Sequence, residues 1–373
     1  MKANRLVRCL MALVCAAGAG GCAGLGDGTF LGDSRSAEAV IADRLLLEAA
    51  DQGRLEHAMF ALELGADVDA TERNLDRTPL MLASDHGFEP IVQLLLAMGA
   101  HADTQSEEGW TALMYAVNGG QAAIVRQLLA SGADPEATDP QSGFSALMLA
   151  SLLGDVDTIA ALAGAGADVT RRAGDEGDTP LVLAAANAGT RAPLAVAELL
   201  VRGAEIETPN DGGVTPLIAA VLAANLDTVR LLLDEGAAPD RQSDEGHTPL
   251  GLACLAGNPA LVEALLLAGA DPDRRSAGGV APLLLAASGG HREVAALLVD
   301  AGAGVDSVDP IQGRTALMLA AGRGDAEMVD LLLHLGADAG LAGADGMTAR
   351  AIAQRQGYRD VLRLLDGSGS AQL

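Results

Sequence analysis

Short apolar runs alternate with stretches rich in Gly and Asp along most of this 373-residue chain. Within residues 313–338, Leu317 and Ala320 lie on one face of a short helix, and a second apolar run with helical spacing follows Gly324. Gly readily ends a helix because it adopts the left-handed conformation at little cost. Residues 338–346 are again rich in Gly and Asp, which is typical of a turn or hairpin. The pattern therefore predicts a helix, a tight turn, a second helix and a hairpin.

This unit recurs along the chain with spacings of 33 to 36 residues. A Thr or Ser at the start of the first helix can cap its free N–H groups, and Pro fits the position that follows. One short helix pair cannot bury its own apolar face, but stacked pairs can. We predict a single all-α repeat solenoid over residues 43–366, with about ten stacked helix pairs, β-hairpin or turn connections, and degenerate units at both ends. A weaker copy begins at Arg44, and the motif itself begins at Thr78, Thr111, Ser145, Thr179, Thr215, Thr248, Ala281, Thr315 and Thr348.

The order T-P-L…A, the closing G-A-D and the period together resemble the ankyrin repeat. The resemblance implies stacked helix pairs that bind other proteins on a concave face. The unit of 36 residues departs from the family pattern, and its extra residues near 189–193 are expected to bulge between the two helices. The family's motif His is also missing, so we expect its inter-repeat hydrogen bonds to be replaced by apolar packing. The residues at that position are Met81, Met114, Met148, Val182, Ile218, Gly251, Leu284 and Met318.

The N-terminus has a different composition. Residues 1–21 combine basic residues, an apolar run and small residues, which is typical of a signal peptide that is removed. The following A-G-G-C, ending at Cys22, resembles the bacterial lipobox, which implies lipidation of Cys22. The alternative is an ordinary signal peptide cleaved nearby, with Cys22 incidental. With Cys22 lipidated, residues 22–42 are expected to form the lipidated end and a flexible tether. At the other end of the chain, residues 367–373 are expected to form a loose tail. This places the protein on the periplasmic side of a bacterial envelope, as an outer-membrane lipoprotein.

The net charge of −26 favours protein partners over nucleic acid. An acidic surface repels phosphate backbones and attracts a basic protein, although the charge could serve solubility alone. Cys254 falls in the alanine columns of its repeat and is expected to be an inert core thiol. The six histidines are scattered over separate repeats, and no phosphate-binding or nucleophile motif is present. We therefore expect no enzyme activity, no metal and no cofactor.

The residues expected to contact a partner lie on the concave face. Trp110, Tyr115 and Phe144 come from adjacent repeats, with Leu152 and Leu153 nearby, and aromatic anchors of this kind often dominate binding. The alternative is that Tyr115 and Phe144 pack into the groove between repeats. The position before the motif Thr is expected to be exposed and adds Arg77, Asp178, His247 and Arg314. Acidic residues at the hairpin tips are expected to form a rim, at Glu107, Glu108, Asp139, Asp175, Glu176 and Asp178.

These observations favour a non-catalytic, monomeric protein-binding scaffold, attached to the envelope only through an N-terminal lipid anchor. One alternative is an immunity or inhibitor protein that neutralises a secreted effector enzyme. Another is a structural or stress-protective envelope protein without a specific client.

Overall fold

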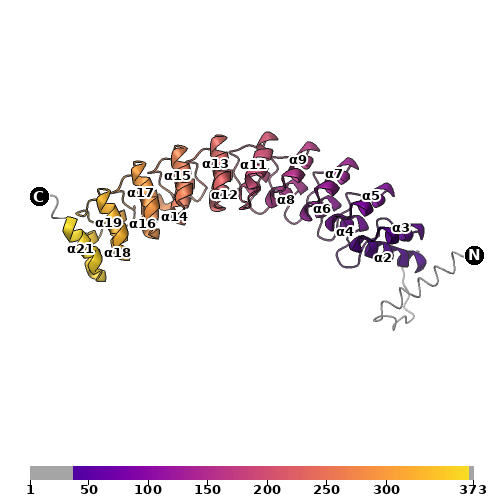
Figure 1. Ribbon diagram of the computed structural model, residues 1–373, viewed down its shortest axis with the longest axis horizontal. Helices are drawn as coiled ribbons and strands as arrows, with labels where there is room; N and C mark the ends of the chain where they lie inside the picture. The colour runs from indigo at the N-terminus through magenta and orange to yellow at the C-terminus, as the bar shows by residue number, and fades with distance from the viewer. Residues whose placement is uncertain (1–36, 369–373) are drawn as a thin grey trace, which may run out of the picture.

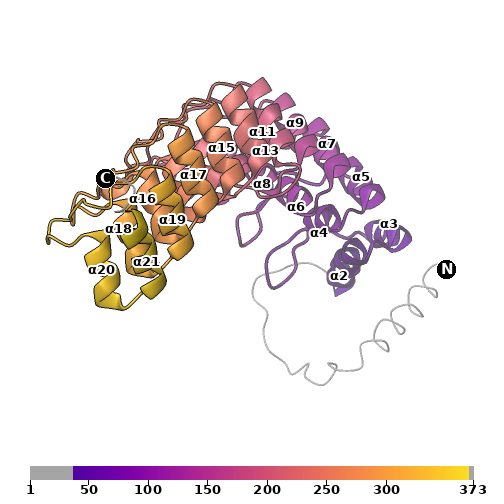
Figure 2. The same cartoon turned by 60° about the vertical axis from the view of Figure 1, so that its left-hand side comes forward.

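The helix pairs stack side by side into a curved arc. The computed structural model describes residues 37–368, and this part of the chain contains twenty α-helices, one short 3-10 helix (η1, Ala277–Gly279) and no β-strand. The first helix of each pair lies on the concave side and the second on the convex side (Figure 1). Loops that we call fingers join consecutive pairs and project from the stack (Figure 2). The predicted all-α repeat solenoid is confirmed.

The helix bounds follow the predicted units closely. The first helices are α2 (Ala37–Gln52), α4 (Pro79–Asp85), α6 (Ala112–Asn118), α8 (Ala146–Leu153), α10 (Pro180–Ala185), α12 (Pro216–Leu222), α14 (Pro249–Ala256), α16 (Pro282–Gly289), α18 (Ala316–Arg323) and α20 (Ala349–Gln356). The second helices are α3 (Leu55–Glu63), α5 (Glu89–Ala97), α7 (Ala122–Ala130), α9 (Val156–Gly164), α11 (Ala192–Val201), α13 (Leu226–Asp234), α15 (Pro259–Leu267), α17 (Arg292–Asp300), α19 (Ala326–His334) and α21 (Arg359–Ser368).

The motif Thr begins the first helix as the sequence predicts. Thr78 Oγ1 accepts a hydrogen bond from the N–H of Met81 at 3.3 Å, which satisfies one of the donors left free at a helix start. Equivalent bonds begin every later first helix except α16, where Ala281 has no side-chain oxygen. The cap is therefore a feature of almost every unit and not of one helix.

Each unit buries its apolar side chains against its neighbours. In the unit that begins at Thr315, Leu317, Ala320 and Leu332 are all 0% exposed. Alanines on the first helix leave room for the next first helix, so the layer between units is thin and closely packed. One continuous apolar cluster runs from Leu46 to Leu365.

The column that lacks the family's His is apolar in most units but not in all. Met81 and Met114 are 1% and 0% exposed, as expected for packing that replaces the hydrogen bonds. At Gly251 the expectation is wrong. Ser276 of the next unit fills the space there, and its Oγ accepts a hydrogen bond from the N–H of Thr248 at 3.2 Å. A Cβ on Gly251 would lie 2.3 Å from that Oγ, so the Gly makes the inter-repeat bond possible.

A row of carboxylates ties each unit to the next, which the sequence analysis did not foresee. The acidic residue four positions after the closing Gly accepts a hydrogen bond from a backbone N–H of the following unit. Asp240, for example, accepts from the N–H of Asp271 at 3.1 Å. We call these bonds the carboxylate ladder. Its acceptors are Asp69, Asp103, Glu136, Glu207, Asp240, Asp273 and Asp306, with distances from 2.7 to 3.1 Å. At the start of the stack, Asp43 of α2 accepts the matching bond from the N–H of Asp67 at 2.7 Å, and we count it as the eighth acceptor although no closing Gly precedes it.

The ladder is interrupted at Thr170, which occupies the acceptor position of its unit. No carboxylate of the described chain accepts from the N–H of Glu205, the matching donor in the next unit. That next unit is also the one with 36 residues, and residues 186–191 join its helices where residues 223–225 suffice in the following unit. The extra residues therefore lie between the helices, as predicted. Asn187 holds the longer connection to the preceding unit, with its Nδ2 donating to the carbonyl of Leu152 at 2.7 Å.

Two expected boundaries shift. Helix α2 begins at Ala37, so the expected boundary of a flexible tether at residue 42 is wrong for its last six residues. Helix α21 continues to Ser368, past the expected start of the tail at residue 367. The proposed signal peptide, Cys22 and residues 369–373 lie outside the described residues. The expected hairpin connections are reduced to isolated antiparallel bridges, at Thr138–Ser145, Ala173–Asp178, Val308–Thr315 and Ala342–Thr348.

Restoring the missing ladder bond should stabilise the solenoid. We expect Thr170→Asp to raise the free energy of unfolding by about 0.5–1.5 kcal/mol, because it offers a carboxylate to the N–H of Glu205. The substitution also removes the hydrogen bond from Thr170 Oγ1 to Asp168, and Thr170→Val controls for that loss. Urea unfolding followed by circular dichroism measures the difference. An Asp variant no more stable than the Val variant would show that the ladder contributes nothing at this position.

Candidate protein-binding surface

The concave surface is built from the first helices and the fingers that precede them. A side-chain oxygen near the start of a finger accepts from the N–H of the residue before the motif Thr and so closes the finger. Ser106 Oγ accepts from Trp110 at 3.2 Å, and Asp309 Oδ2 accepts from Arg314 at 2.8 Å. This holds the backbone of the residue before the motif Thr in place. The residues at that position are half-buried, less exposed than expected: Arg77, Trp110, Phe144, Asp178, Val214, His247, Val280, Arg314 and Met347.

Two fingers are closed by an aspartate, which is buried in the case of Asp139 and half-buried in the case of Asp309. Asp139 accepts hydrogen bonds from the N–H groups of Gln141 and Ser142 at 2.9 and 2.7 Å, and Asp309 accepts equivalent bonds in its own finger. Burial opposes ionisation of both carboxyls, but these hydrogen bonds outweigh it and lower the pKa of each below its usual value. Asp139 is 7% exposed. The expectation that Asp139 belongs to an exposed acidic rim is therefore wrong, because its carboxylate accepts hydrogen bonds from the backbone of its own finger.

The aromatic residues divide between interior and surface. Tyr115 is 5% exposed and stacks obliquely on Trp110, with ring centroids 5.3 Å apart. Its hydroxyl donates to Ser106 Oγ at 3.3 Å, and burial raises the pKa of the phenol. Tyr115 therefore supports its finger from inside, which corrects its expected position as a partner contact. Trp110 is half-buried and keeps part of its surface in solvent.

Phe144 also packs between units. Its ring lies over Gly174 of the next finger, where an added Cβ would be 2.9 Å from the ring edge. No ring contact joins Phe144 to Trp110 or Tyr115 within residues 37–368. The predicted aromatic patch is therefore one ring pair in one unit and a separate ring in the next.

Four leucines are exposed at the ends of first helices. Leu152 and Leu153 are 45% and 50% exposed, as expected, and Leu222 and Leu255 are 62% and 54% exposed. We call these four residues the leucine row. Leu222 and Leu255 occupy the same position as Leu152, seven residues after the motif Thr or Ser, and this shared offset makes their exposure predictable from the sequence.

The charged residues of the predicted site belong to local networks and do not converge. Arg77 forms an ion pair with Glu72 within its own finger. His247 lies 3.3 Å from Glu245, and Arg314 lies 3.7 Å from Asp345 of the next finger. The predicted site is therefore a strip along several repeats and not a single cluster.

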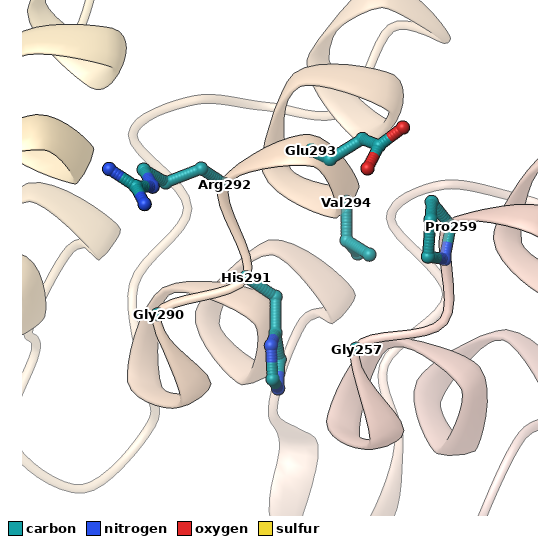
Figure 3. Close-up of a pocket in the computed structure, with 7 residues that line it drawn as sticks. All are labelled: Gly257, Pro259, Gly290, His291, Arg292, Glu293 and Val294. Atoms are coloured by element: carbon teal, nitrogen blue, oxygen red, sulfur yellow. The ribbon is translucent and has the colours of Figure 1, made fainter.

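One hollow lies between consecutive units at the ends of α14 and α16, with a volume of about 360 Å³ (Figure 3). His291 points between the helices there, and a Cβ on Gly257 would lie 2.3 Å from its Nδ1. Arg292 points away from His291 and forms an ion pair with Glu327 of the next unit. These side chains do not converge on a common point, and each contacts a neighbouring unit. We therefore assign the hollow to the contact between repeats and not to a ligand site.

A second hollow of about 360 Å³ lies on the concave face between α10 and α12. Its apolar lining includes Val182, Leu183 and Leu222, and Glu176 and Asp178 lie at its finger end. We call it the α10–α12 hollow. It is continuous with the leucine row through Leu222.

The remaining chemistry of the described chain is limited. No group of three potential metal ligands is present among residues 37–368. Cys254 is 0% exposed, and burial raises the pKa of its thiol to about 12, which matches the expected inert core position. No described helix has the length and apolar character needed to cross a membrane.

Acid should destabilise the solenoid through Asp139 and Asp309. Their pKa values are lowered in the folded state, so the unfolded chain binds protons more readily, and the stability they contribute is lost as the pH falls below about 4. We expect the free energy of unfolding to fall between about pH 5 and 3, and to fall less in the double variant Asp139→Asn/Asp309→Asn. Denaturant titrations at several pH values measure both slopes. Equal slopes would contradict the role assigned to these carboxylates.

The comparisons with known proteins agree with the repeat architecture. A family model described as ankyrin repeats in three copies matches residues 46–139, 185–276 and 283–370. An ankyrin repeat and KH domain-containing protein of Caenorhabditis briggsae is 31% identical over 192 residues, which is 50% of this chain and 6% of that protein. The B-cell lymphoma 3 protein homolog of Mus musculus is 40% identical over 86 residues, 23% of this chain and 19% of that protein.

A third relative is the ankyrin repeat and SAM domain-containing protein 6 of Mus musculus, 41% identical over 97 residues, which is 22% of this chain and 11% of that protein. The chain thus spans less than a fifth of the length of each of these three relatives. The family model, in contrast, covers well over half of the chain. The chain belongs to the ankyrin repeat family.

Proposed function

We propose that this chain is a non-catalytic protein-binding scaffold whose partner contacts the concave face at the leucine row. The observation that carries the proposal is the exposure of Leu152, Leu153, Leu222 and Leu255 on the first helices α8, α12 and α14. Exposed apolar surface of this kind marks interaction sites in soluble proteins. Membership of the ankyrin repeat family supports a protein partner over a small substrate.

The stiffness of the stack supports the same function. The fingers are closed by side-chain oxygens, and the carboxylate ladder joins most consecutive units. A surface that is already ordered before binding loses little conformational entropy when a partner docks. The closed fingers therefore order the surface on each side of the ladder interruption at Thr170, which lies between Leu153 and Leu222.

The acidic charge supports a basic partner, but only part of it is available. Eight carboxylates accept hydrogen bonds in the ladder, and Asp139 and Asp309 close fingers. The finger-tip acids Glu107, Asp175 and Glu176 are exposed and can attract cationic groups. We propose that these tips, with Glu108 and Asp178 beside them, steer the partner toward the leucine row.

We also propose that the solenoid is tethered to a bacterial envelope through lipidated Cys22, on its periplasmic side. The support is the sequence of residues 1–22, where basic, apolar and small residues precede the cysteine. A lipid anchor would keep the concave face near the membrane while leaving it accessible to soluble proteins.

The partner proposal is tested by affinity capture from envelope extract. We expect Leu222→Ser/Leu255→Ser to lose the protein that the unaltered chain recovers, because the apolar contact is removed. Val201→Ser/Leu267→Ser is the matched control, since these residues are 80% and 82% exposed on second helices. Circular dichroism checks that each variant is folded. Equal recovery with both double variants would exclude the leucine row as the contact surface.

The anchor is tested separately by labelling cells with radioactive palmitate. Cys22→Ala should abolish label incorporation and release the protein into the soluble fraction, whereas Cys254→Ala, which changes a buried thiol, should leave both unchanged. Label retained by Cys22→Ala, or absent from the unaltered protein, would rule out lipidation at this residue.

A further inference from the structure

The α10–α12 hollow exists because small side chains replace larger ones in two columns. Ala219 lies four residues after its motif Thr, where the units on either side have Leu183 and Leu252. Ala186 lies seven residues after its motif Thr, where the next unit has Leu222. Each alanine leaves space that a leucine would fill, and both line the hollow. The volume of about 360 Å³ is enough for one long side chain with its backbone and lies at the lower end of ligand-binding sites in proteins.

The finger end of the hollow carries negative charge that no nearby cation neutralises. Asn210 Nδ2 donates to Asp178 Oδ1 at 2.9 Å and lies 3.4 Å from Glu176 Oε2, so one amide positions both carboxylates. Arg172, on the same finger as these acids, is paired instead with Asp211 at 2.6 Å. Neither Glu176 nor Asp178 forms an ion pair with another residue in the described part of the chain. The hollow thus has an apolar floor and an acidic end.

We propose that the α10–α12 hollow receives an arginine side chain of the partner protein, from a segment whose neighbouring residues are aliphatic. An arginine has an aliphatic stem and a charged planar head, and buried stems with heads at polar groups are common in proteins. The stem lies over Ala219 and against Leu222, and the guanidinium meets Glu176 and Asp178. Two carboxylates held side by side suit its forked donors better than the single charge of a lysine. The flanking aliphatic side chains contact the leucine row.

This inference rests on the proposed function, because it assigns one residue of the partner to one part of the same surface. It adds one requirement for the bound segment that would not apply if the contact were only apolar. The bound segment must lose affinity when its central positive charge is removed without a change of shape.

The test uses fluorescence polarisation with the full chain and three labelled peptides. All three have leucines around a central residue, which is arginine, the isosteric but uncharged citrulline, or glutamate. We expect the arginine peptide to bind about tenfold more tightly than the citrulline peptide, and the glutamate peptide most weakly. Equal affinity for the arginine and citrulline peptides, or no binding of the arginine peptide at millimolar concentration, would overturn the proposal.

Two substitutions locate the binding within the hollow. Ala219→Leu fills the floor and should weaken the arginine peptide about tenfold, while Glu176→Gln should weaken it about threefold and leave the citrulline peptide unchanged. Leucine already occupies the position of Ala219 in neighbouring units, so the variant is expected to keep its melting temperature. Ala130→Leu and Glu263→Gln make the same chemical changes at exposed positions on the second helices α7 and α15, away from the concave face. They should alter affinity less than twofold, within roughly 0.4 kcal/mol. Equal effects of test and control substitutions would place the arginine elsewhere.

The outcomes separate this proposal from the proposed function. Loss of the captured protein in Leu222→Ser/Leu255→Ser, with no discrimination between arginine and citrulline, would leave the scaffold function and remove the arginine subsite. Sedimentation of the chain alone tests whether a second copy of this chain occupies the hollow instead. Self-association that Ala219→Leu abolishes would assign the hollow to a second copy of this chain and contradict the proposal.

Discussion

The contact between neighbouring repeats is the interaction on which this structure depends. A pair of helices of six to ten residues, as in most units, has too little apolar surface to fold alone, so each unit completes its core against the next. The alanines of the first helix keep this contact close, and hydrogen bonds extend it beyond the core. Ladder carboxylates accept from backbone N–H groups of the following unit, and Ser276 reaches back into the space left by Gly251. The polar and apolar contacts therefore repeat together along the chain.

This constraint changes how the acidic composition is interpreted. Many of the Asp and Glu residues have a structural task between or within units, so the net charge alone overstates the attraction for a basic partner. Glu107, Asp175 and Glu176 remain available and are exposed at the finger tips. Glu176 and the half-buried Asp178 lie at the end of the α10–α12 hollow. The same distinction applies to the aromatic residues. Tyr115 and Phe144 support fingers, whereas the leucines at the ends of the first helices are directed to solvent.

Most of the fold could be predicted from the sequence because its determinants are local and repeat with a constant period. The helix start at each motif Thr, the Gly that ends a helix and the longer connection near residue 189 all follow from residues within one unit. The ladder bonds and the bond between Thr248 and Ser276 were missed because they join residues more than twenty positions apart. The bonds of Asp139 are local, to Gln141 and Ser142, but the sequence does not show that the finger folds around this carboxylate. Ser276 has no visible role in its own unit, because its partner is Thr248 of the preceding one. The early start of α2 at Ala37 was missed because this first unit lacks the motif.

Equilibrium unfolding of a series of shortened chains, which lack one, two, three or more C-terminal units, tests most directly whether contact between repeats supplies the stability. If contact between repeats supplies the stability, the free energy of unfolding should fall by a similar step with each unit removed, and chains of one or two units should show no cooperative transition. A single unit that folds on its own would contradict the account. So would a free energy of unfolding that stays constant as units are removed.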